Sequence, residues 1–422
     1  KKIIMKFYYN SIKLFAVSML VATNFSCSSD DDSSDSPVLV YGCTDVSSVN
    51  YDANANSDDG SCVTPPDSYV FERGGETTVS YGGQTARLDM AASLFGKLND
   101  ENVSGADLLQ MFEDGTGFTA DDGASQGEID AIEALNNSGK KLGNKTAAYG
   151  DASVQPKIAG FLTEYADNVS TNFNVDASVG VAGSHTGSGG RTVRINEKGM
   201  ELNQVFAKSL IGALVMDQVA YGYLSQVKIG DDVDNDASAL GAGEYTTMEH
   251  HFDEGLGYVY GQESDITTAA TPQGNGILFN KYLKKVDSDT GEEPGLGMEI
   301  YDAFVAGRAA IVADNSTVRD AQAEIIKTKM SRVIIHKAAH YLRGAAEAKA
   351  AADVDYADYF HGLSEGYGFI LSLQFTYDTD GMNYFSFSEV DSMLSTLESG
   401  NGFWDRTPSE LDDMAAQIEA KL

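Results

Sequence analysis

Cysteine is scarce in this chain, and its distribution excludes several kinds of chemistry. The 422 residues contain three cysteines, Cys27, Cys43 and Cys62, and residues 63–422 contain none. A thiolate is required both for a cysteine nucleophile and for the cysteine-based zinc sites. Neither kind of site can therefore occur in the long C-terminal part of the chain.

Basic residues are also few, and the charge balance limits the partners of the protein. Lysine and arginine number 29 against 63 aspartates and glutamates, which gives a formal net charge of −34 at pH 7. A surface of this charge repels the phosphates of nucleic acids and attracts cations. We therefore expect no nucleic-acid partner, while the acidic excess by itself is explained by solubility.

Long hydrophobic runs are absent, so the sequence predicts no membrane-spanning helix. The apolar stretch 14–22 follows basic residues and is typical of the core of a signal peptide. It is followed by the tetrapeptide NFSC at 24–27, which resembles a lipobox with asparagine in the usual aliphatic position. We expect residues 1–26 to be a signal peptide and Cys27 to carry a lipid.

An acidic segment follows the expected lipidation site. Residues 27–42 begin with CSSDDD, which is similar to the acidic tether of Bacteroidetes lipoproteins, where such a tether can direct export to the cell surface. The several acyl chains of a bacterial lipoprotein anchor a protein firmly in the membrane. The resemblance therefore implies an outer-membrane lipoprotein at the cell surface, whose membrane contact is the lipid on Cys27.

Residues 43–62 form a candidate disulfide module. The runs GCTD, NYD and DDGSC in and beside this segment are similar to a short element of secreted Bacteroidetes proteins. With Cys27 lipidated, Cys43 and Cys62 make an even pair, and an oxidising compartment favours a disulfide between them. The two prolines at 65–66 indicate a stiff linker that separates this module from the rest of the chain.

Two acidic loops offer oxygen ligands for calcium. One is the run 231–236, which has aspartates at alternate positions but lacks the sixth-position glycine and twelfth-position glutamate of an EF-hand. We favour solvated loops at both places and keep calcium as the alternative. The candidate ligands in the disulfide module are Asp45, Asp52, Asp58 and Asp59.

The remaining chain has a helical pattern. After a short expected β-hairpin within 67–82, apolar residues such as Leu88 and Leu94 recur at helical spacing from Arg87 onward. The segment GASQG at 123–127 matches the G-x-S-x-G pattern of hydrolases, but acidic residues and not a strand precede it. We therefore interpret this segment as a turn and predict a mostly α-helical fold.

The most informative feature is an internal repeat. The pattern Y-x4-H-x3-E-G-x-G-aromatic occurs twice, once starting at Tyr245 and once at Tyr356, and a long helical segment precedes each copy. A repeat of this length predicts a duplicated helical bundle. Its two halves would span residues 67–286 and 287–422.

Histidines cluster on the helices of this repeat, where residues three or four positions apart share a face. Five of the six histidines lie there, and His185 is the exception. Histidine together with carboxylates suits a first-row metal such as iron. A simpler interpretation of the same residues is a buried His–Glu contact that fixes the core of each half. The candidate metal ligands are His250, His251, Glu254, His336, His340, His361 and Glu365.

These residues also carry a resemblance to a known family. The segments YTTMEHHFDEGLGYVYG and FHGLSEGYGFILSL, with NKYLKK, AFVAGRAAI and HYL, resemble the Bacteroidetes lipoprotein family catalogued as domain of unknown function 4856, over about residues 67–422. That family looks imelysin-like. Imelysins are helical proteins of two bundle halves with a G-x-H-x-x-E signature, tied to iron uptake and once classed as metallopeptidases. Here His251 and Glu254 supply the H-x-x-E, Glu249 replaces the glycine, and the second copy spaces histidine and glutamate by four.

Three functions remain as expectations. The His–Glu pairs and the resemblance indicate a surface or periplasmic lipoprotein that binds iron, haem or another divalent metal and works with an outer-membrane transporter. The alternative is a non-catalytic scaffold that binds a protein or glycan partner. A metallopeptidase with Glu254 as its base ranks last, because the chain has no H-E-x-x-H. We therefore expect a binding protein and not an enzyme.

Overall fold

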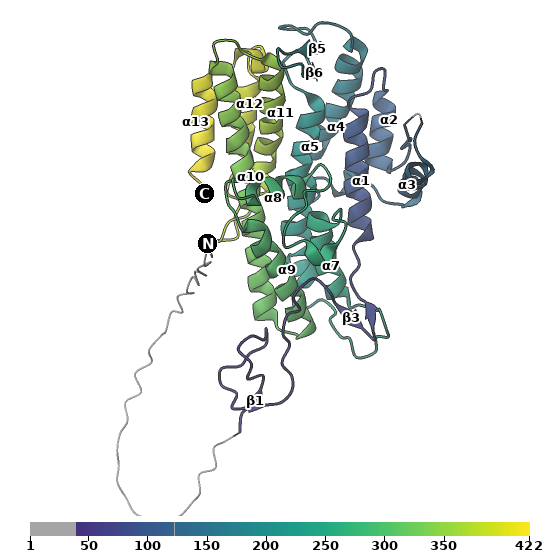
Figure 1. Cartoon of the computed structure of the whole chain (residues 1–422), viewed down its shortest axis with the longest axis vertical. Coiled ribbons are helices and arrows are strands. Elements are labelled where there is room, and N and C mark those ends of the chain that lie inside the picture. The colour runs from purple at the N-terminus through teal and green to yellow at the C-terminus, as the bar shows by residue number, and fades with distance from the viewer. Residues whose placement is uncertain (1–38, 122) are drawn as a thin grey trace, which may run out of the picture.

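The computed structural model describes residues 39–121 and 123–422. The expected signal peptide, the lipidation site Cys27 and most of the tether 27–42 lie outside these residues. The described chain is mostly helical with short two-stranded sheets, so the predicted fold class is confirmed. Most of the long helices run along the long axis of an elongated molecule, and a small module lies beyond one end of it (Figure 1).

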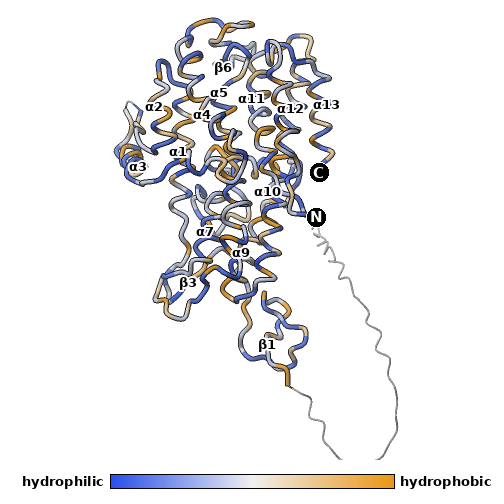
Figure 2. Tube along the Cα trace, turned by 180° about the vertical axis from the view of Figure 1, so that it is seen from behind, coloured by the Kyte–Doolittle hydropathy of each residue, from blue (hydrophilic) through white to orange (hydrophobic). Residues whose placement is uncertain are grey.

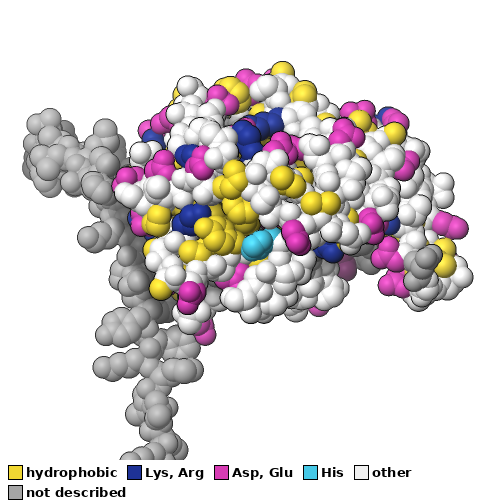
Figure 3. Space-filling view, turned by 90° about the horizontal axis from the view of Figure 1, so that it is seen from above, with side chains coloured by type: hydrophobic (Ala, Val, Ile, Leu, Met, Phe, Trp, Pro, Cys, Tyr) yellow, Lys and Arg dark blue, Asp and Glu magenta, His cyan; other side chains and the backbone are white. Residues whose placement is uncertain are grey.

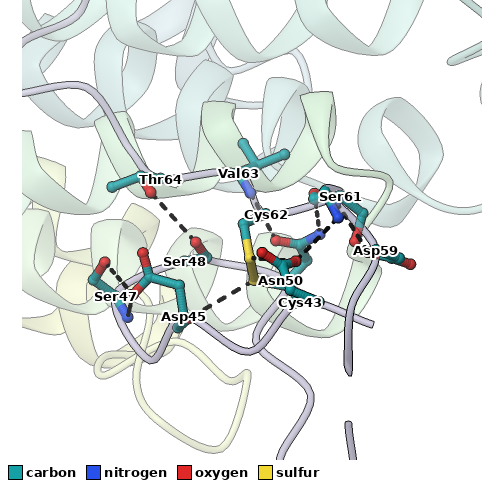
Figure 4. Close-up of a disulfide and its surroundings, with 12 residues drawn as sticks. Cys43, Asp45, Ser47, Ser48, Asn50, Asp59, Ser61, Cys62, Val63 and Thr64 are labelled. Atoms are coloured by element: carbon teal, nitrogen blue, oxygen red, sulfur yellow. Dashed lines mark hydrogen bonds between the residues drawn. A yellow bond between two sulfur atoms is a disulfide. The ribbon is translucent and has the colours of Figure 1, made fainter. Parts of the chain in front are cut away.

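The small module is closed by a disulfide. Cys43 and Cys62 are joined with an S–S distance of 2.12 Å, which confirms the predicted pair (Figure 4). Strands β1 (Tyr41–Gly42) and β2 (Ser57–Asp58) pair in parallel beside it. The acidic side chains stabilise local turns. For example, the carboxylate of Asp45 accepts hydrogen bonds from the amide and the hydroxyl of Ser47.

The module contacts the helical domain. The side-chain amide of Asn315 donates a hydrogen bond to the carbonyl of Val49 at 2.9 Å, and Val49 and Val63 pack against the main core. The expectation that the prolines at 65–66 separate the module from the domain is therefore wrong. The linker is short enough for the module to fold back onto the turn between two long helices.

The helical domain begins with the expected hairpin, although only two residues of each strand pair. Strands β3 (Glu72–Arg73) and β4 (Glu76–Thr77) are antiparallel, and helix α1 (Gly82–Lys97) follows. Leu88 and Leu94 are buried on one face of α1, as their helical spacing predicts. Several short helical segments lie around this helix: α2 (Gly105–Leu109), η1 (Gln110–Asp114), η2 (Gly143–Lys145), α4 (Val154–Glu164), η3 (Tyr165–Val169) and η4 (Ser170–Asn172).

The G-x-S-x-G segment opens a helix. Ser125 is the N-cap of α3 (Gln126–Asn137), and its hydroxyl accepts a hydrogen bond from the amide of Glu128. The Glu128 carboxylate in turn accepts one from the Ser125 amide. This capping box satisfies amides that the first turn of a helix leaves free. The interpretation of the segment as a turn is confirmed.

A wide helix lies at the centre of the domain. Helix α5 (Leu202–Leu210) continues into η5 (Ile211–Tyr223), a π-helix of 13 residues, and nearly every residue of both is buried. Strands β5 (Gly183–Thr186) and β6 (Thr192–Ile195) precede them as a hairpin. The hairpin lies at the end of the molecule seen in Figure 3, where hydrophobic side chains gather between charged ones.

The longest helix, α10 (Ser316–Ala350), has 35 residues and packs against three other helices of the C-terminal region, α9, α11 and α13. Its length lets it contact elements at both ends of the domain (Figure 1). The other helical segments of this part are α6 (Gln226–Ile229), α7 (Thr247–Tyr260), η6 (Ile266–Thr268), α8 (Phe279–Asp287), α9 (Leu296–Val312), α11 (Tyr356–Ser372), η7 (Leu373–Phe375), α12 (Phe387–Glu398), η8 (Gly402–Asp405) and α13 (Pro408–Glu419).

The domain has one continuous hydrophobic core. Buried apolar residues from Tyr69 to Ile418 belong to a single cluster, so the predicted halves 67–286 and 287–422 share a core. Hydrophobic and hydrophilic residues alternate along the helices, as expected for helices with one buried face (Figure 2). Among the described helices, none is long and apolar enough to cross a membrane.

Candidate functional site

The two copies of the repeated motif lie near the starts of helices α7 and α11, and side-chain caps fix both starts. Thr246 and Glu249 form a capping box at the start of α7. At the start of α11 the carboxylate of Asp355 accepts hydrogen bonds from the amides of the two residues that follow Tyr356. Each cap sets where the helix begins and therefore which side chains share a face.

Each motif brings its histidine and its glutamate onto one face, one helical turn apart. His250 Nε2 lies 3.9 Å from a carboxylate oxygen of Glu254, and His361 Nε2 lies 3.9 Å from one of Glu365. These separations exceed hydrogen-bond distance, so each pair lies in proximity without a direct hydrogen bond. The sequence prediction that these residues lie together is confirmed for the two pairs.

The first glycine of each motif lets the helix approach a matching tyrosine. A Cβ on Gly255 would lie 3.6 Å from the Cβ of Tyr223, and one on Gly366 would lie 3.3 Å from the Cβ of Tyr341. Both tyrosines belong to Tyr-Leu pairs on the helical segments that precede the motifs. The two copies therefore pack alike, whereas duplication of the complete halves stays a prediction.

The second glycine of each motif packs against a polar residue, and here the copies differ in charge. A Cβ on Gly257 would lie 3.1 Å from the Cβ of Gln84 on α1. One on Gly368 would lie 2.5 Å from the Cβ of Lys208 on α5. A Cβ on Gly257 would lie nearer still to the Cβ of Tyr81, at 2.5 Å. Gln84 and Lys208 nevertheless share one feature, because each also contacts the motif glutamate, as a neutral side chain at the first motif and a cation at the second.

The glutamate of the second motif forms a buried ion pair. Glu365 Oε1 lies 3.0 Å from Lys208 Nζ and accepts a 2.9 Å hydrogen bond from the hydroxyl of Tyr282. Burial raises the pKa of the Glu365 carboxyl, but Lys208, His361 and the hydrogen bonds outweigh this effect and lower the pKa to about 2. The carboxylate is therefore charged and already neutralised by a protein cation.

The glutamate of the first motif has no such ion pair. Glu254 Oε1 accepts a 2.8 Å hydrogen bond from the amide of Gln84, which also lies 3.3 Å from the Tyr223 hydroxyl. The exposed fraction of the Glu254 side chain is 19% against 8% for Glu365. The first motif is thus the more accessible of the two, and among the described residues no lysine or arginine forms an ion pair with its glutamate.

His251 does not join Glu254, although the two supply the H-x-x-E of the sequence. Its Nδ1 lies 2.7 Å from the carbonyl of Lys228, and its Nε2 lies 3.3 Å from the Lys228 ammonium. Burial lowers the pKa of His251. A neutral imidazole that donates from Nδ1 and accepts at Nε2 fits both contacts.

His361 makes its strong contact with a carboxylate outside the motif. Its Nδ1 lies 2.7 Å from Glu201, the residue that precedes helix α5. The ring therefore bridges two carboxylates, Glu201 on one side and Glu365 on the other. The sequence offered no signal for Glu201, because it lies far from the motif along the chain.

His336 and His340 form a separate group on α10. His336 Nε2 lies 3.1 Å from Glu293, and His340 Nδ1 lies 3.0 Å from Glu292, both in the loop before α9. Lys337 binds the same Glu292 at 2.7 Å. Both rings thus pair with carboxylates of this loop, and their role as metal ligands beside the second motif stays a prediction.

The seven predicted ligands therefore do not meet in one place. Within residues 39–121 and 123–422, no three His, Cys, Asp or Glu side chains are arranged to hold a metal ion. The charges that are close together are paired as imidazole with carboxylate or as ammonium with carboxylate. At Glu365 the ammonium of Lys208 already neutralises the carboxylate.

The sequence interpretation missed a buried ion network at the first motif. The Arg308 side chain is completely buried and binds Glu249 at 2.9 Å and Asp253 at 3.1 Å. Asp253 also accepts a 2.7 Å hydrogen bond from the Tyr69 hydroxyl, and burial raises its pKa to about 6 against the lowering effect of Arg308. The available signal was an arginine inside the apolar segment AFVAGRAAI.

These features define a helical domain built around paired His–Glu motifs and buried ion pairs. A family model described as "Domain of unknown function (DUF4856)" matches residues 66–422, so the chain belongs to this family. The suspected membership is confirmed. No curated protein and no solved structure matches the chain.

Proposed function

We propose that this protein is a non-catalytic, lipid-anchored binding protein whose paired His–Glu motifs stabilise the domain and do not hold a metal. This is the scaffold alternative drawn from the sequence. The family match covers almost the whole helical domain, and its description names no activity. The proposal therefore rests on the contacts made by the motif residues.

The observation that carries the proposal is the ion pair between Lys208 and Glu365. Both side chains are buried, with exposed fractions of 3% and 8%, and their charged atoms are 3.0 Å apart. A metal ion at Glu365 would lie beside this ammonium, and the repulsion would be strong in a buried site. The donor set of the second motif therefore does not fit a metal.

The histidines do not fit the metallopeptidase alternative either. Catalytic zinc is held by three protein ligands around an open position, and each ligand must present a free nitrogen or oxygen. His251 is occupied by the carbonyl and the ammonium of Lys228, and Glu254 lies beside Gln84 and His250. These contacts favour binding or structural roles over hydrolysis.

Metal binding remains the second candidate function, favoured by one observation. His336 and His340 lie on one face of α10 with Glu292 and Glu293 close to them, and His340 is exposed. Imidazole and carboxylate together suit iron or another first-row metal. A protein that binds iron or haem here would act with an outer-membrane transporter, as the family resemblance implies.

Metal analysis of the purified protein separates the two candidates. We expect less than stoichiometric iron and zinc by mass spectrometry, and no heat of binding for ferrous, ferric or zinc ions at micromolar concentration. His340→Gln is the matched variant, because it removes the most exposed imidazole. Stoichiometric metal that this variant loses would contradict the proposal and establish metal binding on α10.

A further inference from the structure

A group of polar side chains surrounds Tyr223 at the first motif. The Tyr223 hydroxyl lies 3.3 Å from the amide of Gln84 and 3.5 Å from the Lys145 ammonium. The ring lies 6.4 Å from that of His251 and 6.0 Å from that of Tyr258. We define the Tyr223 cluster as Gln84, Arg87, Lys145, Tyr223, Lys228, His251, Glu254 and Tyr258.

Three cations of this cluster lack a carboxylate partner among the described residues. Arg87 donates to two backbone carbonyls, those of Gly83 and Lys141. Lys145 contacts Tyr223, and Lys228 contacts His251. Burial and the nearby guanidinium of Arg87 lower the pKa of Lys145. An anionic group would therefore be stabilised beside these cations, although the whole chain has a net charge of −34.

The one carboxylate of the cluster is Glu254, and it has acceptor capacity to spare. Oε1 receives the amide of Gln84, Oε2 lies 3.9 Å from the His250 imidazole, and the Tyr223 hydroxyl also lies beside the carboxylate, which leaves lone pairs for a further donor. At the second motif Lys208 neutralises the corresponding Glu365. Glu254 would repel a bare anion but would accept hydrogen bonds from ligand hydroxyl groups.

One buried polar atom of the cluster, Tyr258 Oη, has no hydrogen-bond partner among the described residues, and two more such atoms lie on residues next to the cluster. Within the described part of the chain six buried side-chain N or O atoms have no hydrogen-bond partner, and three of them are Tyr258 Oη, His250 Nδ1 and Gln218 Oε1. Tyr258 is 1% exposed. Gln218 adjoins the cluster, since its amide donates to the Lys145 carbonyl. Buried polar atoms without a partner are uncommon, and water or a ligand in the cluster would supply their hydrogen bonds.

We propose that the Tyr223 cluster binds a small polyhydroxylated acid, such as a sugar that carries a carboxylate or a phosphate. Lys145 and Lys228, both half-buried, bind the anionic group, and Arg87 contributes its charge from behind. Glu254 accepts hydrogen bonds from the hydroxyl groups of the ligand. This inference adds a ligand class to the proposed binding function and is independent of the metal test.

Calorimetric titration of the purified protein with four probes tests the ligand class. Glucuronate supplies hydroxyls and a carboxylate, glucose 6-phosphate supplies hydroxyls and a phosphate, and glucose and inorganic phosphate each supply only one of the two features. We expect at least one of the two acidic sugars to bind about tenfold more tightly than glucose or inorganic phosphate, as for loss of one charge-assisted hydrogen bond. Equal affinity for glucose or for phosphate alone, or no binding of either acidic sugar, would overturn the proposal.

Substitutions locate the site. Lys145→Gln and Lys228→Gln should each weaken the acidic sugar by about tenfold. Lys141→Gln is the control, because the exposed Lys141 side chain pairs with Asp114. Glu254→Gln should weaken the acidic sugar but strengthen inorganic phosphate by removing repulsion. Equal losses in the control, or tighter sugar binding by Glu254→Gln, would contradict the assignment. Thermal melts establish that every variant is folded.

Discussion

At the residue scale, the same motif glutamate has two different roles. Glu365 neutralises a buried lysine, whereas Glu254 is partly buried beside a glutamine. Their sequence surroundings are alike, so the difference comes from residues Lys208 and Gln84 on other helices. Removing one partner of a buried ion pair leaves the other charge uncompensated, which costs far more than losing a neutral hydrogen bond.

We predict a large stability difference between the two matched glutamine substitutions. Glu365→Gln keeps the shape but leaves Lys208 buried without its counter-charge, so the free energy of unfolding should fall by about 3–5 kcal/mol. Glu254→Gln should cost about 1 kcal/mol or less, because it loses only a hydrogen bond to a neutral amide. Urea unfolding of both variants measures this. Similar costs would show that the Lys208 pair is unimportant for stability.

At the element scale, helix packing depends on close approach at glycine. Helix α11 lies so near α5 that a Cβ on Gly368 would meet the Lys208 Cβ at 2.5 Å and the amide nitrogen of Ser209 at 2.9 Å. Gly344 on α10 is different, because nothing lies within 4 Å of its Cβ position. Only the first glycine is therefore required by packing.

Alanine at these two glycines should change stability in opposite directions. Gly368→Ala must separate two buried helices, and we expect a loss of about 1–3 kcal/mol in the free energy of unfolding. Gly344→Ala should gain up to about 1 kcal/mol, because alanine favours a helix over glycine. Thermal or urea unfolding measures both values. If Gly368→Ala were as stable as the wild type, the close packing of α11 on α5 would be incorrect.

The loop between α8 and α9 is bound to α10 by charge. Glu292 contacts Lys337 and His340, and Glu293 contacts His336 and Arg332. Burial raises the pKa of Glu292, but the hydrogen bonds from His340 and Lys337 outweigh it and lower the pKa to about 2. A carboxyl whose folded-state pKa is lowered contributes stability above its unfolded pKa and loses it as pH falls toward the folded value.

We therefore expect the contribution of Glu292 to the free energy of unfolding to decrease as the pH falls. Glu292→Gln should destabilise the protein at pH 6, where the wild-type carboxyl is charged in both states. The difference between variant and wild type should shrink between about pH 4.3, a typical unfolded glutamate pKa, and pH 2. Unfolding free energies at several pH values test this, with the exposed Glu347→Gln as control. A difference that is constant with pH would contradict the ion pairs of the loop.

At the scale of the whole molecule, no helix of the described domain is long and apolar enough to cross a membrane. We propose the lipid on Cys27 as the membrane anchor. The disulfide between Cys43 and Cys62 supports export, because such bonds persist in oxidising compartments. We infer that the acidic tether between Cys27 and the module places the domain at the cell surface. The family description names no location, so the position at the cell surface is a proposal.

Loss of the acylated cysteine should release the protein. Cys27→Ser is expected to move it from the membrane fraction to the soluble fraction, because the variant lacks the thiol that would carry the proposed acyl chains. Cell fractionation followed by immunoblotting measures this, and protease treatment of intact cells tests surface exposure. A variant that stays entirely in the membrane fraction would rule out Cys27 as the anchor.

The sequence by itself determined the local and covalent features of this protein. Helical spacing predicts the helical fold, the single cysteine pair beyond Cys27 predicts the disulfide, and the repeated spacing places a histidine and a glutamate one turn apart on two helices. Family membership also follows from these segments. Helix formation and the His–Glu spacing depend on residues that are neighbours along the chain, and the disulfide follows because only one pair of cysteines is available.

Only the tertiary structure decided which charges meet. Arg308 reaches Glu249 and Asp253, Lys208 reaches Glu365, and His361 reaches Glu201, each from a distant part of the sequence. Which partner a buried charge finds depends on the packing of whole helices, and spacing along one helix does not contain that information. The sequence therefore places His250 with Glu254 and His361 with Glu365, but it could not show that His251 turns to Lys228 or that Lys208 neutralises Glu365.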